Sequence, residues 1–317
     1  MKVLFVSPEV TPLARTGGLG DVVGALPPAL LNAGLDVRIL SPLHRGALKK
    51  LESKRLEGSL RIKIGARRRS MRVVETRLPG TDVPVYLLEH KELYDRSGLY
   101  AGPRGDYPDN AERALVLCRS ALQLPIITRW HPDVYHAHDW MAAALPACLN
   151  AARRPEDRAP SASVLTIHNL GHQGTFPPES FDLTGLPDSY FHMDGFEHYG
   201  RLNLLKGGIQ HADKITTVSP TYAEEIRNES HGHGLHPSLD FRAADLVGIL
   251  NGIDEDAWNP MNDDALPKPF GPDTVEVGKQ ACRAALSEEL GFPNSHSLPL
   301  FGAVTRLYHQ KGLDLLL

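Results

Sequence analysis

Residues 1–8 read Met-Lys-Val-Leu-Phe-Val-Ser-Pro, and residues 15–24 read Arg-Thr-Gly-Gly-Leu-Gly-Asp-Val-Val-Gly. The apolar run 3–7 predicts a buried strand, and the glycines lead into a helix predicted over 19–31, which Gly34 closes. Two prolines, Pro27 and Pro28, predict a kink or a break within that helix. A strand followed by a helix is the repeating unit of an α/β fold.

The same alternation continues along the chain. Further apolar runs, each followed by a segment of helical periodicity, occupy residues 37–40, 83–88, 134–138, 164–168, 215–218 and 246–250. Because these runs are apolar almost throughout, they predict parallel strands that helices cover on both faces. A further helix is predicted over 221–227, with Ser219 as its N-cap. The fold class is therefore α/β, with a Rossmann-like, doubly wound parallel sheet.

A proline-rich stretch divides the chain. Residues 260–272 resemble a linker, so we expect one domain over 1–260 and a linker with a second unit over 261–317. A helix predicted over 277–290 and a strand predicted over 300–304 would begin a second Rossmann-like domain. The sequence stops within a helical pattern at Leu317, which predicts a truncated chain.

Composition excludes several classes of protein. The 317 residues carry 34 Lys+Arg and 38 Asp+Glu, so the formal net charge is -4, which argues against nucleic acid as a partner. No apolar run reaches the about 18 residues of a membrane span, and the N-terminal run is too short for a signal peptide. Three widely spaced cysteines predict reduced thiols and a cytoplasmic protein. The basic run 61–72 alternates with apolar residues around Gly65 and predicts a solvated hairpin rather than a nucleic-acid surface.

The glycines before the first helix form a candidate anion site. The backbone N–H groups of Gly17 and Gly18, with the positive end of the helix dipole, could hold a diphosphate; the alternative is an ordinary tight turn. A dinucleotide site is disfavoured, because about ten residues separate the strand from the glycines and no acid ends the second strand.

Polar residues also end two later strands. His136 and His138 lie on one face of a strand, and Asp139 follows at its carboxyl end. The next strand ends at His168 and Asn169, so carboxylate, imidazole and amide would gather at one edge and suit sugar hydroxyls. The alternatives are a metal site, which the spacing disfavours, buried structural histidines, or a plain polar loop. The histidines of residues 231–236 fit a flexible loop as well as a metal site.

Arg306 and Lys311 flank a second strand-to-helix connection. Both cations could converge on phosphates, although surface charges of this kind are common.

Taken together, these motifs resemble the bacterial glycogen synthase and plant starch synthase family of retaining glucosyltransferases. The resemblance covers nearly the whole chain and is carried by residues 7–27, 136–140 (His-Ala-His-Asp-Trp), 166–169 (Thr-Ile-His-Asn), 212–222 and 251–254 (Asn-Gly-Ile-Asp). Residues 305–312 identify only the wider GT-B superfamily, whose members have two Rossmann-like domains.

The resemblance implies glucose transfer from ADP-glucose, or less often UDP-glucose, to the non-reducing end of an α-1,4-glucan, with retention of configuration and without a cofactor or metal. It places Gly17 and Gly18 at the diphosphate, and Arg306 and Lys311 at the departing nucleotide. It places five polar residues around the transferred glucose: Asp21, Asp139, His168, Asn169 and Asn251. Tyr94 and Trp140 could stack on glucan or donor, with core packing as the alternative.

Two departures from the family bear on function. Arg15 stands where the family has lysine, which exchanges a compact ammonium for a planar fork in the donor region. The chain also ends before the family's downstream glutamate motif, so we expect it to be inactive alone. Two alternatives stay open, namely another GT-B retaining glycosyltransferase and a glucan-binding half-enzyme without turnover.

Overall fold

The computed structural model describes residues 1–49, 51–153, 161–292, 298–307 and 309–316. They form two compact units, Met1–Gly252 and Ile253–Leu317. Two residues used above, Tyr308 within 305–312 and the C-terminal Leu317, lie outside the described residues.

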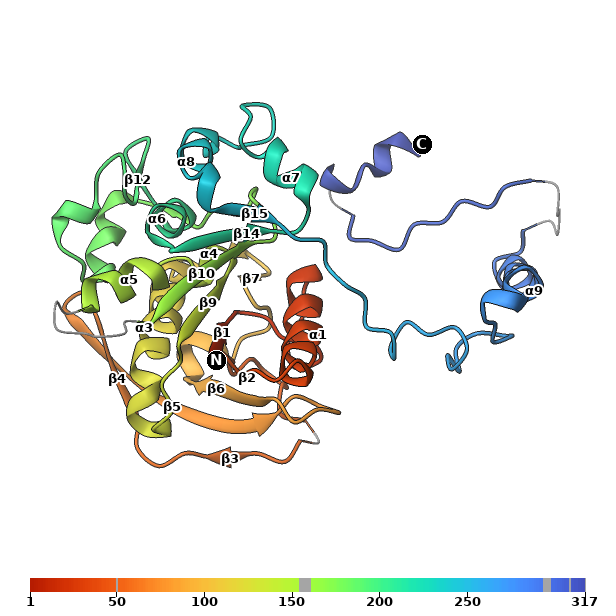
Figure 1. Ribbon diagram of the computed structural model, residues 1–317, viewed down its shortest axis with the longest axis horizontal. Helices are drawn as coiled ribbons and strands as arrows, with labels where there is room; N and C mark the ends of the chain where they lie inside the picture. Colours follow the sequence, from red (N-terminus) through yellow and green to blue (C-terminus); the bar gives the residue numbers. More distant parts are fainter. Residues whose placement is uncertain (50, 154–160, 293–297, 308, 317) are drawn as a thin grey trace. The chain divides into compact units, whose positions relative to one another are not determined.

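A parallel sheet forms the centre of the first unit (Figure 1). Its parallel strands are, in spatial order, β15 (Leu246–Gly248), β14 (Lys214–Thr217), β10 (Ala162–Ile167), β9 (Val134–His138), β1 (Lys2–Val6), β2 (Asp36–Pro42) and β6 (Pro84–Glu89). Antiparallel β5 (Arg67–Arg77) and β3 (Lys54–Arg55) continue it beyond β6. Each strand predicted for this unit overlaps one of the parallel strands, so the predicted α/β fold is confirmed.

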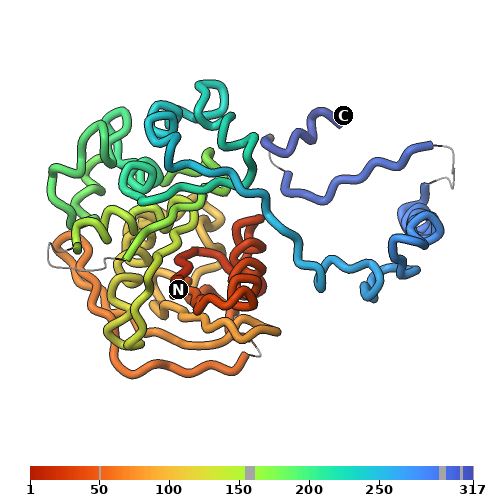
Figure 2. The backbone as a smooth tube through the Cα atoms, viewed as in Figure 1, coloured from red at the N-terminus to blue at the C-terminus, as the bar shows by residue number. Residues whose placement is uncertain are grey.

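Helices cover both faces of this sheet. On one face lies α1 (Gly18–Asn32), and on the other lie α3 (Asn110–Thr128), α4 (Asp139–Ala142), α5 (Leu145–Ala152) and α6 (Leu204–His211) (Figure 1). Alternate residues of β1 serve the two faces: Phe5 packs in the core on the α1 side, whereas Leu4 packs in the core on the other side. Figure 2 shows the N-terminal segment in the middle of this unit, where β1 pairs with β2 and β9.

The first helix is continuous, so the predicted break does not occur. α1 runs through Pro27 and Pro28 because three of its residues, Leu19, Val23 and Pro27, repeat at intervals of one turn and are buried together. Packing of this face offsets the backbone hydrogen bonds that the prolines cannot donate.

The basic run forms the predicted hairpin. β4 (Leu60–Ile64) pairs antiparallel with β5, and Gly65 in the turn has φ 54°. Leu60, Ile62 and Ile64 are buried, whereas Arg61 and Lys63 between them are exposed.

Smaller elements complete the first unit. They are α2 (Lys91–Tyr94), α7 (Pro220–Glu225), α8 (His236–Phe241), β7 (Ala101–Gly102), β8 (Gly105–Asp106), β11 (Thr175–Phe176), β12 (Glu197–His198), β13 (Arg201–Asn203), and the 3-10 helices Pro178–Thr184, Asp188–Tyr190 and Ala243–Asp245. The predicted cap of α7 is confirmed, because the Ser219 side chain accepts a hydrogen bond from the N–H of Tyr222 at 3.2 Å.

The second unit contains α9 (Val275–Glu289), which confirms the predicted helix, and the 3-10 helices Pro272–Thr274, His309–Lys311 and Leu313–Leu315. The strand predicted over 300–304 is wrong, since these residues form no described element. A strand is stable only when it hydrogen-bonds to a neighbouring strand. No described strand pairs with residues 300–304, and the Phe301 side chain is 81% exposed. Across the part of the chain that the structure describes, no helix combines the length and apolarity needed to cross a bilayer.

Candidate active site

The glycine-rich loop is organised by Glu9, which follows β1 and is buried. Its Oε2 accepts hydrogen bonds from the backbone N–H groups of Thr16 at 2.6 Å and Gly17 at 3.2 Å, and its Oε1 accepts from the Thr16 hydroxyl at 2.6 Å. The N–H of Gly17 is therefore already used, which corrects the expectation that it is available to an anion. An acid placed directly after the first strand was the signal in the sequence for this role.

Gly18, at the end of the loop, is exposed. It is the first residue of α1, where the N–H groups have no intrahelical acceptor, and a Cβ added to it would meet nothing within 4 Å. At Gly24 the situation is reversed, because a Cβ there would lie 2.7 Å from the carbonyl oxygen of Thr11. The loop over 9–17 is thus packed tightly against α1 at one end and is open at the other.

Two other predicted residues of this region pair with each other. Arg15 Nη2 lies 2.9 Å from Asp21 Oδ2, and the Thr11 hydroxyl donates to Asp21 Oδ1 at 3.1 Å. Both members of the ion pair are about half exposed, at 55% and 45% of their side chains. The guanidinium therefore remains accessible, and it partly neutralises Asp21.

Asp139 connects the ends of two neighbouring strands. It begins α4 directly after β9, with φ 53°, and its Oδ1 accepts hydrogen bonds from the N–H groups of His168 at 2.7 Å and Asn169 at 3.4 Å, beyond β10. Burial raises the pKa of Asp139 to about 7, against the lowering effect of these two bonds. A carboxyl group with such a pKa can hold or release a proton near neutrality.

Three histidines stack beside this carboxylate. The His138 ring lies 4.2 Å from that of His136 and 5.3 Å from that of His168, centroid to centroid, and Phe5 packs on His138 at 5.1 Å. Burial lowers the pKa of His136 to about 3 and that of His168 to about 4, and it lowers the pKa of His138 as well. The rings are therefore neutral at pH 7, and each presents one donor and one acceptor.

Tyr100 links the glycine loop to the Asp139 region. Its hydroxyl donates to Glu9 Oε1 at 2.6 Å, and its ring lies 6.0 Å from that of Trp140, the residue after Asp139. Trp140 is half-buried, also packs against Phe176 at 6.0 Å, and so retains an accessible part. Neither Glu9 nor Tyr100 was predicted as a site residue.

Tyr94 does not support the predicted stacking role. Its ring is fully buried, and its hydroxyl donates to the carbonyl oxygen of Arg113 at 2.9 Å. Core packing, the alternative named from sequence, is what the structure describes, because α2 turns this side chain into the core with Leu93.

The remaining predicted residues lie in loops of the first unit or in the second unit. Asn169 accepts a hydrogen bond from the N–H of Gly171 at 2.9 Å, and Asn251 is exposed in the segment after β15. Arg306 and Lys311 are exposed in the second unit. In the first unit, Asp139, His168 and Asn169 follow the carboxyl ends of the adjacent strands β9 and β10, where α/β sheets bind ligands. Glu9, beyond the neighbouring β1, holds the loop that leads to Gly18.

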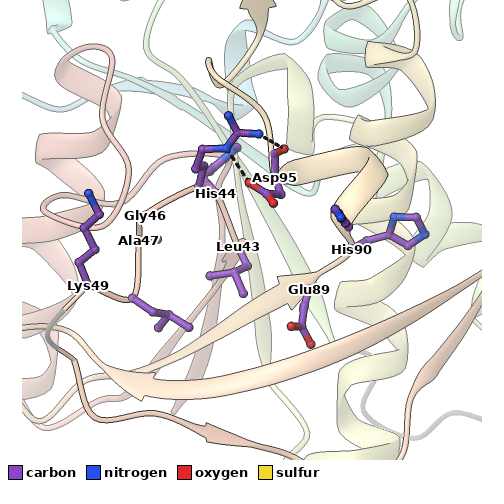
Figure 3. Close-up of a pocket in the computed structure, with 11 residues that line it drawn as sticks. Leu43, His44, Gly46, Ala47, Lys49, Glu89, His90 and Asp95 are labelled. Carbon is purple, nitrogen blue, oxygen red and sulfur yellow. Dashed lines mark hydrogen bonds and ion pairs between the residues drawn. The ribbon is translucent and has the colours of Figure 1, made fainter.

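A hollow of about 550 Å³ lies at the carboxyl ends of β2 and β6 (Figure 3). Apolar and charged side chains line it, among them Leu43, Lys49 and Glu89, and Arg45 Nε donates to Asp95 Oδ1 at 2.7 Å at its rim. His44 also lines the hollow, and its Nε2 lies 3.0 Å from the carbonyl oxygen of Pro8 in the loop after β1. The hollow therefore lies at the same edge of the sheet, and His44 connects it to the loop after β1.

Among the residues whose placement is described, no three His, Cys, Asp or Glu side chains are grouped so that they could hold a metal ion. This holds for the histidine stack and for the loop over 231–236.

Comparisons with known proteins agree with this geometry. The family model of the starch synthase catalytic domain matches residues 2–240. Glycogen synthase 2 of Geobacter sulfurreducens is 44% identical over all of this chain and 65% of its own length, and glycogen synthase 1 of Methylococcus capsulatus is 44% identical over all of this chain and 63% of its own. The solved catalytic domain of starch synthase IV from Arabidopsis thaliana, bound to ADP and acarbose, matches with a TM-score of 0.86 and 30% identity over 99% of this chain and 64% of that chain.

The fold is accordingly that of a GT-B glycosyltransferase catalytic domain, with its polar site at the carboxyl edge of the sheet. The chain belongs to the starch synthase catalytic domain family. It spans slightly less than two thirds of the length of the curated relatives it matches.

Proposed function

We propose that this chain is the larger part of a glycogen or starch synthase, which transfers glucose from ADP-glucose to the non-reducing end of an α-1,4-glucan with retention of configuration. UDP-glucose is the second donor to test, because Arg15 stands where the family has lysine. We also propose the cytoplasm as its compartment, for which the unpaired Cys118, Cys148 and Cys282 are the support.

The bond between Asp139 Oδ1 and the N–H of His168 carries this proposal. It holds a carboxylate, an imidazole and an amide at one edge of the sheet, and the open start of α1 follows the neighbouring strand β1. Donors and acceptors of this kind suit the hydroxyl groups of a hexose, whereas the free N–H groups of a helix N-terminus suit a diphosphate.

The roles follow from charge development during transfer. As the glycosidic bond breaks, negative charge grows on the diphosphate and positive charge on the sugar ring. In our proposal the start of α1 at Gly18, with Arg306 and Lys311, stabilises the diphosphate. Asp139 and His168, with Asp21, Asn169 and Asn251, orient the glucose, and Trp140 packs on sugar.

A chimera tests the activity. The chain is joined to the C-terminal part of the Geobacter glycogen synthase 2 that lies beyond the match, and is incubated with glycogen and ADP-[14C]glucose. We expect label in ethanol-insoluble glucan, and we expect it to be lost in His168→Ala. Label in a free disaccharide would indicate another GT-B transferase instead. Titration of the unmodified chain with maltoheptaose tests the half-enzyme alternative, which predicts binding and no labelled product.

A further inference from the structure

We propose that His138 is a positioning residue that holds His168 in the tautomer with its proton on Nδ1. Where a sugar binds, this directs an imidazole N–H donor at a hydroxyl oxygen, and that consequence rests on the proposed function. The assignment of the tautomer itself does not rest on the proposed function.

The contact between the two rings defines the proposal. His138 Nδ1 lies 3.0 Å from His168 Nε2, and the rings are 29° from parallel. His138 is fully buried, whereas His168 is half-buried, so His168 is the ring of the pair that a ligand can reach.

Only two proton arrangements allow this hydrogen bond between neutral rings. In the first, His138 Nδ1–H donates to His168 Nε2, and His168 carries its own proton on Nδ1. In the second, His168 Nε2–H donates to His138 Nδ1, which forces the proton of His138 onto its Nε2.

Burial of His138 Nε2 selects between them. This atom is buried and has no hydrogen-bond partner among the described residues. The second arrangement would leave a buried N–H without an acceptor, and orphaned buried N–H groups are the rarer kind of unsatisfied group. The first arrangement leaves only a lone pair at that atom, in a ring that packs against the rings of Phe5 and His136.

Both rings are neutral at neutral pH, so a doubly protonated histidine does not have to be considered. Burial lowers the pKa of both rings, and the neighbouring histidines lower that of His138 further. Asp139 bonds the backbone of His168 rather than its ring, so it does not compete for either ring nitrogen.

The tautomers can be measured directly in the 317-residue chain. With 15N-labelled histidine at pH 7.5, long-range 15N–1H correlation spectra distinguish an Nδ1–H from an Nε2–H ring, and His138→Phe and His168→Gln assign the two sets of signals. We expect both His138 and His168 to carry their protons on Nδ1. An Nε2–H tautomer at His168 in the unmodified chain would overturn the proposal.

Three variants test the positioning role. His138→Phe keeps a ring in the stack but removes the donor, so His168 should lose its single Nδ1–H state. His138→Asn places an amide N–H where His138 Nδ1–H was and should restore it. The matched control is His136→Phe, which perturbs the same stack without touching the bond to His168, and should leave the His168 tautomer unchanged. If His168 gives the same spectrum in His138→Phe as in the unmodified chain, the positioning role is contradicted. If His138→Phe fails to fold, the spectra of the unmodified chain and of His138→Asn still test the proposal.

Binding of ADP-glucose supplies a second readout. Calorimetric titration of the chimera described above should show ADP-glucose affinity reduced roughly tenfold in His138→Phe, the effect of about one lost hydrogen bond. The affinity should change less than about twofold in His138→Asn and His136→Phe. Equal losses in all three variants would indicate a merely structural role. Absence of ADP-glucose binding by the chimera with unmodified residues would contradict the proposed function, while the tautomer spectra of the 317-residue chain would still decide this inference.

Discussion

The carboxylate of Asp139 accepts a hydrogen bond of 2.7 Å from the backbone N–H of His168, across the ends of two neighbouring strands. The register that pairs His138 with Thr166 sets this relationship, because it brings the residues after β9 and β10 side by side. Asp139 adopts a left-handed backbone conformation, which aspartate and asparagine tolerate better than most residues. Several consequences of these contacts can be measured.

Asp139→Asn should become more stable relative to the unmodified chain as the pH rises. The folded pKa of about 7 lies above the ordinary value of 3.8, so the folded state retains a proton that the unfolded state has lost. Between about pH 4 and pH 7, the free energy of unfolding of the unmodified chain therefore falls by up to about 1.4 kcal/mol per pH unit. Asparagine does not ionise, so the variant avoids this loss while it keeps the Oδ1 acceptor. Urea unfolding at pH 5 and pH 8 measures it; exposed Asp106→Asn is the control, and a pH-independent difference for Asp139→Asn would contradict the prediction.

The histidine stack should make the chain sensitive to acid. The folded pKa values of His136 and His168, about 3 and 4, lie below the ordinary value of 6.5, so stability is complete above about pH 6.5 and falls as the pH drops toward 4. Each buried ring contributes up to about 1.4 kcal/mol per pH unit. His136→Phe should flatten the fall in the urea midpoint between pH 7 and pH 5. An exposed histidine, His131, serves as control, and His131→Gln should leave the fall unchanged.

Glu9→Gln should destabilise the first unit by about 1.5–3 kcal/mol, because an amide nitrogen would replace one of two oxygens that accept hydrogen bonds from the loop and from Tyr100. Tyr100→Phe, which removes a single donor, should cost about 1 kcal/mol. Thermal unfolding of both variants tests this order. A larger loss for Tyr100→Phe would mean that Glu9 does not organise the loop.

Gly18→Ala and Gly24→Ala should separate binding from folding. The added methyl group at Gly18 meets open space, so stability should change by less than about 1 kcal/mol while ADP-glucose affinity falls. At Gly24 it meets the Thr11 carbonyl oxygen at 2.7 Å, and we expect a loss of about 1–3 kcal/mol. Urea unfolding of the 317-residue chain and calorimetric titration of the chimera with ADP-glucose give the two readouts. Affinity unaltered by Gly18→Ala in the chimera would remove the start of α1 from the donor site.

Arg15→Lys should alter donor affinity more than stability. The ion pair with Asp21 is about half exposed, and such pairs contribute about 1 kcal/mol or less, so the unfolding free energy should stay within about 0.5 kcal/mol. Titration of the chimera with ADP-glucose and UDP-glucose measures the affinity. Unchanged affinity for both donors would show that Arg15 is not part of the site.

Periodicity and local motifs were enough to predict the parallel sheet, α1 and its glycine loop, the Ser219 cap, and the position of Asp139, His168 and Asn169 at strand ends. These features depend on residues close together in the chain, where side-chain alternation and capping chemistry act. The prediction of a strand over 300–304 was wrong because a strand forms only when it pairs with other strands, and residues close in sequence do not reveal those partners.

Contacts between distant residues required the tertiary structure. The bond between Tyr100 and Glu9, the burial of Tyr94 under α3, and the bond between His138 and His168 join residues far apart in sequence. Each depends on strand register and helix packing. A change of register by one residue would reverse the face of every side chain on a strand, so no local pattern specifies which polar groups meet.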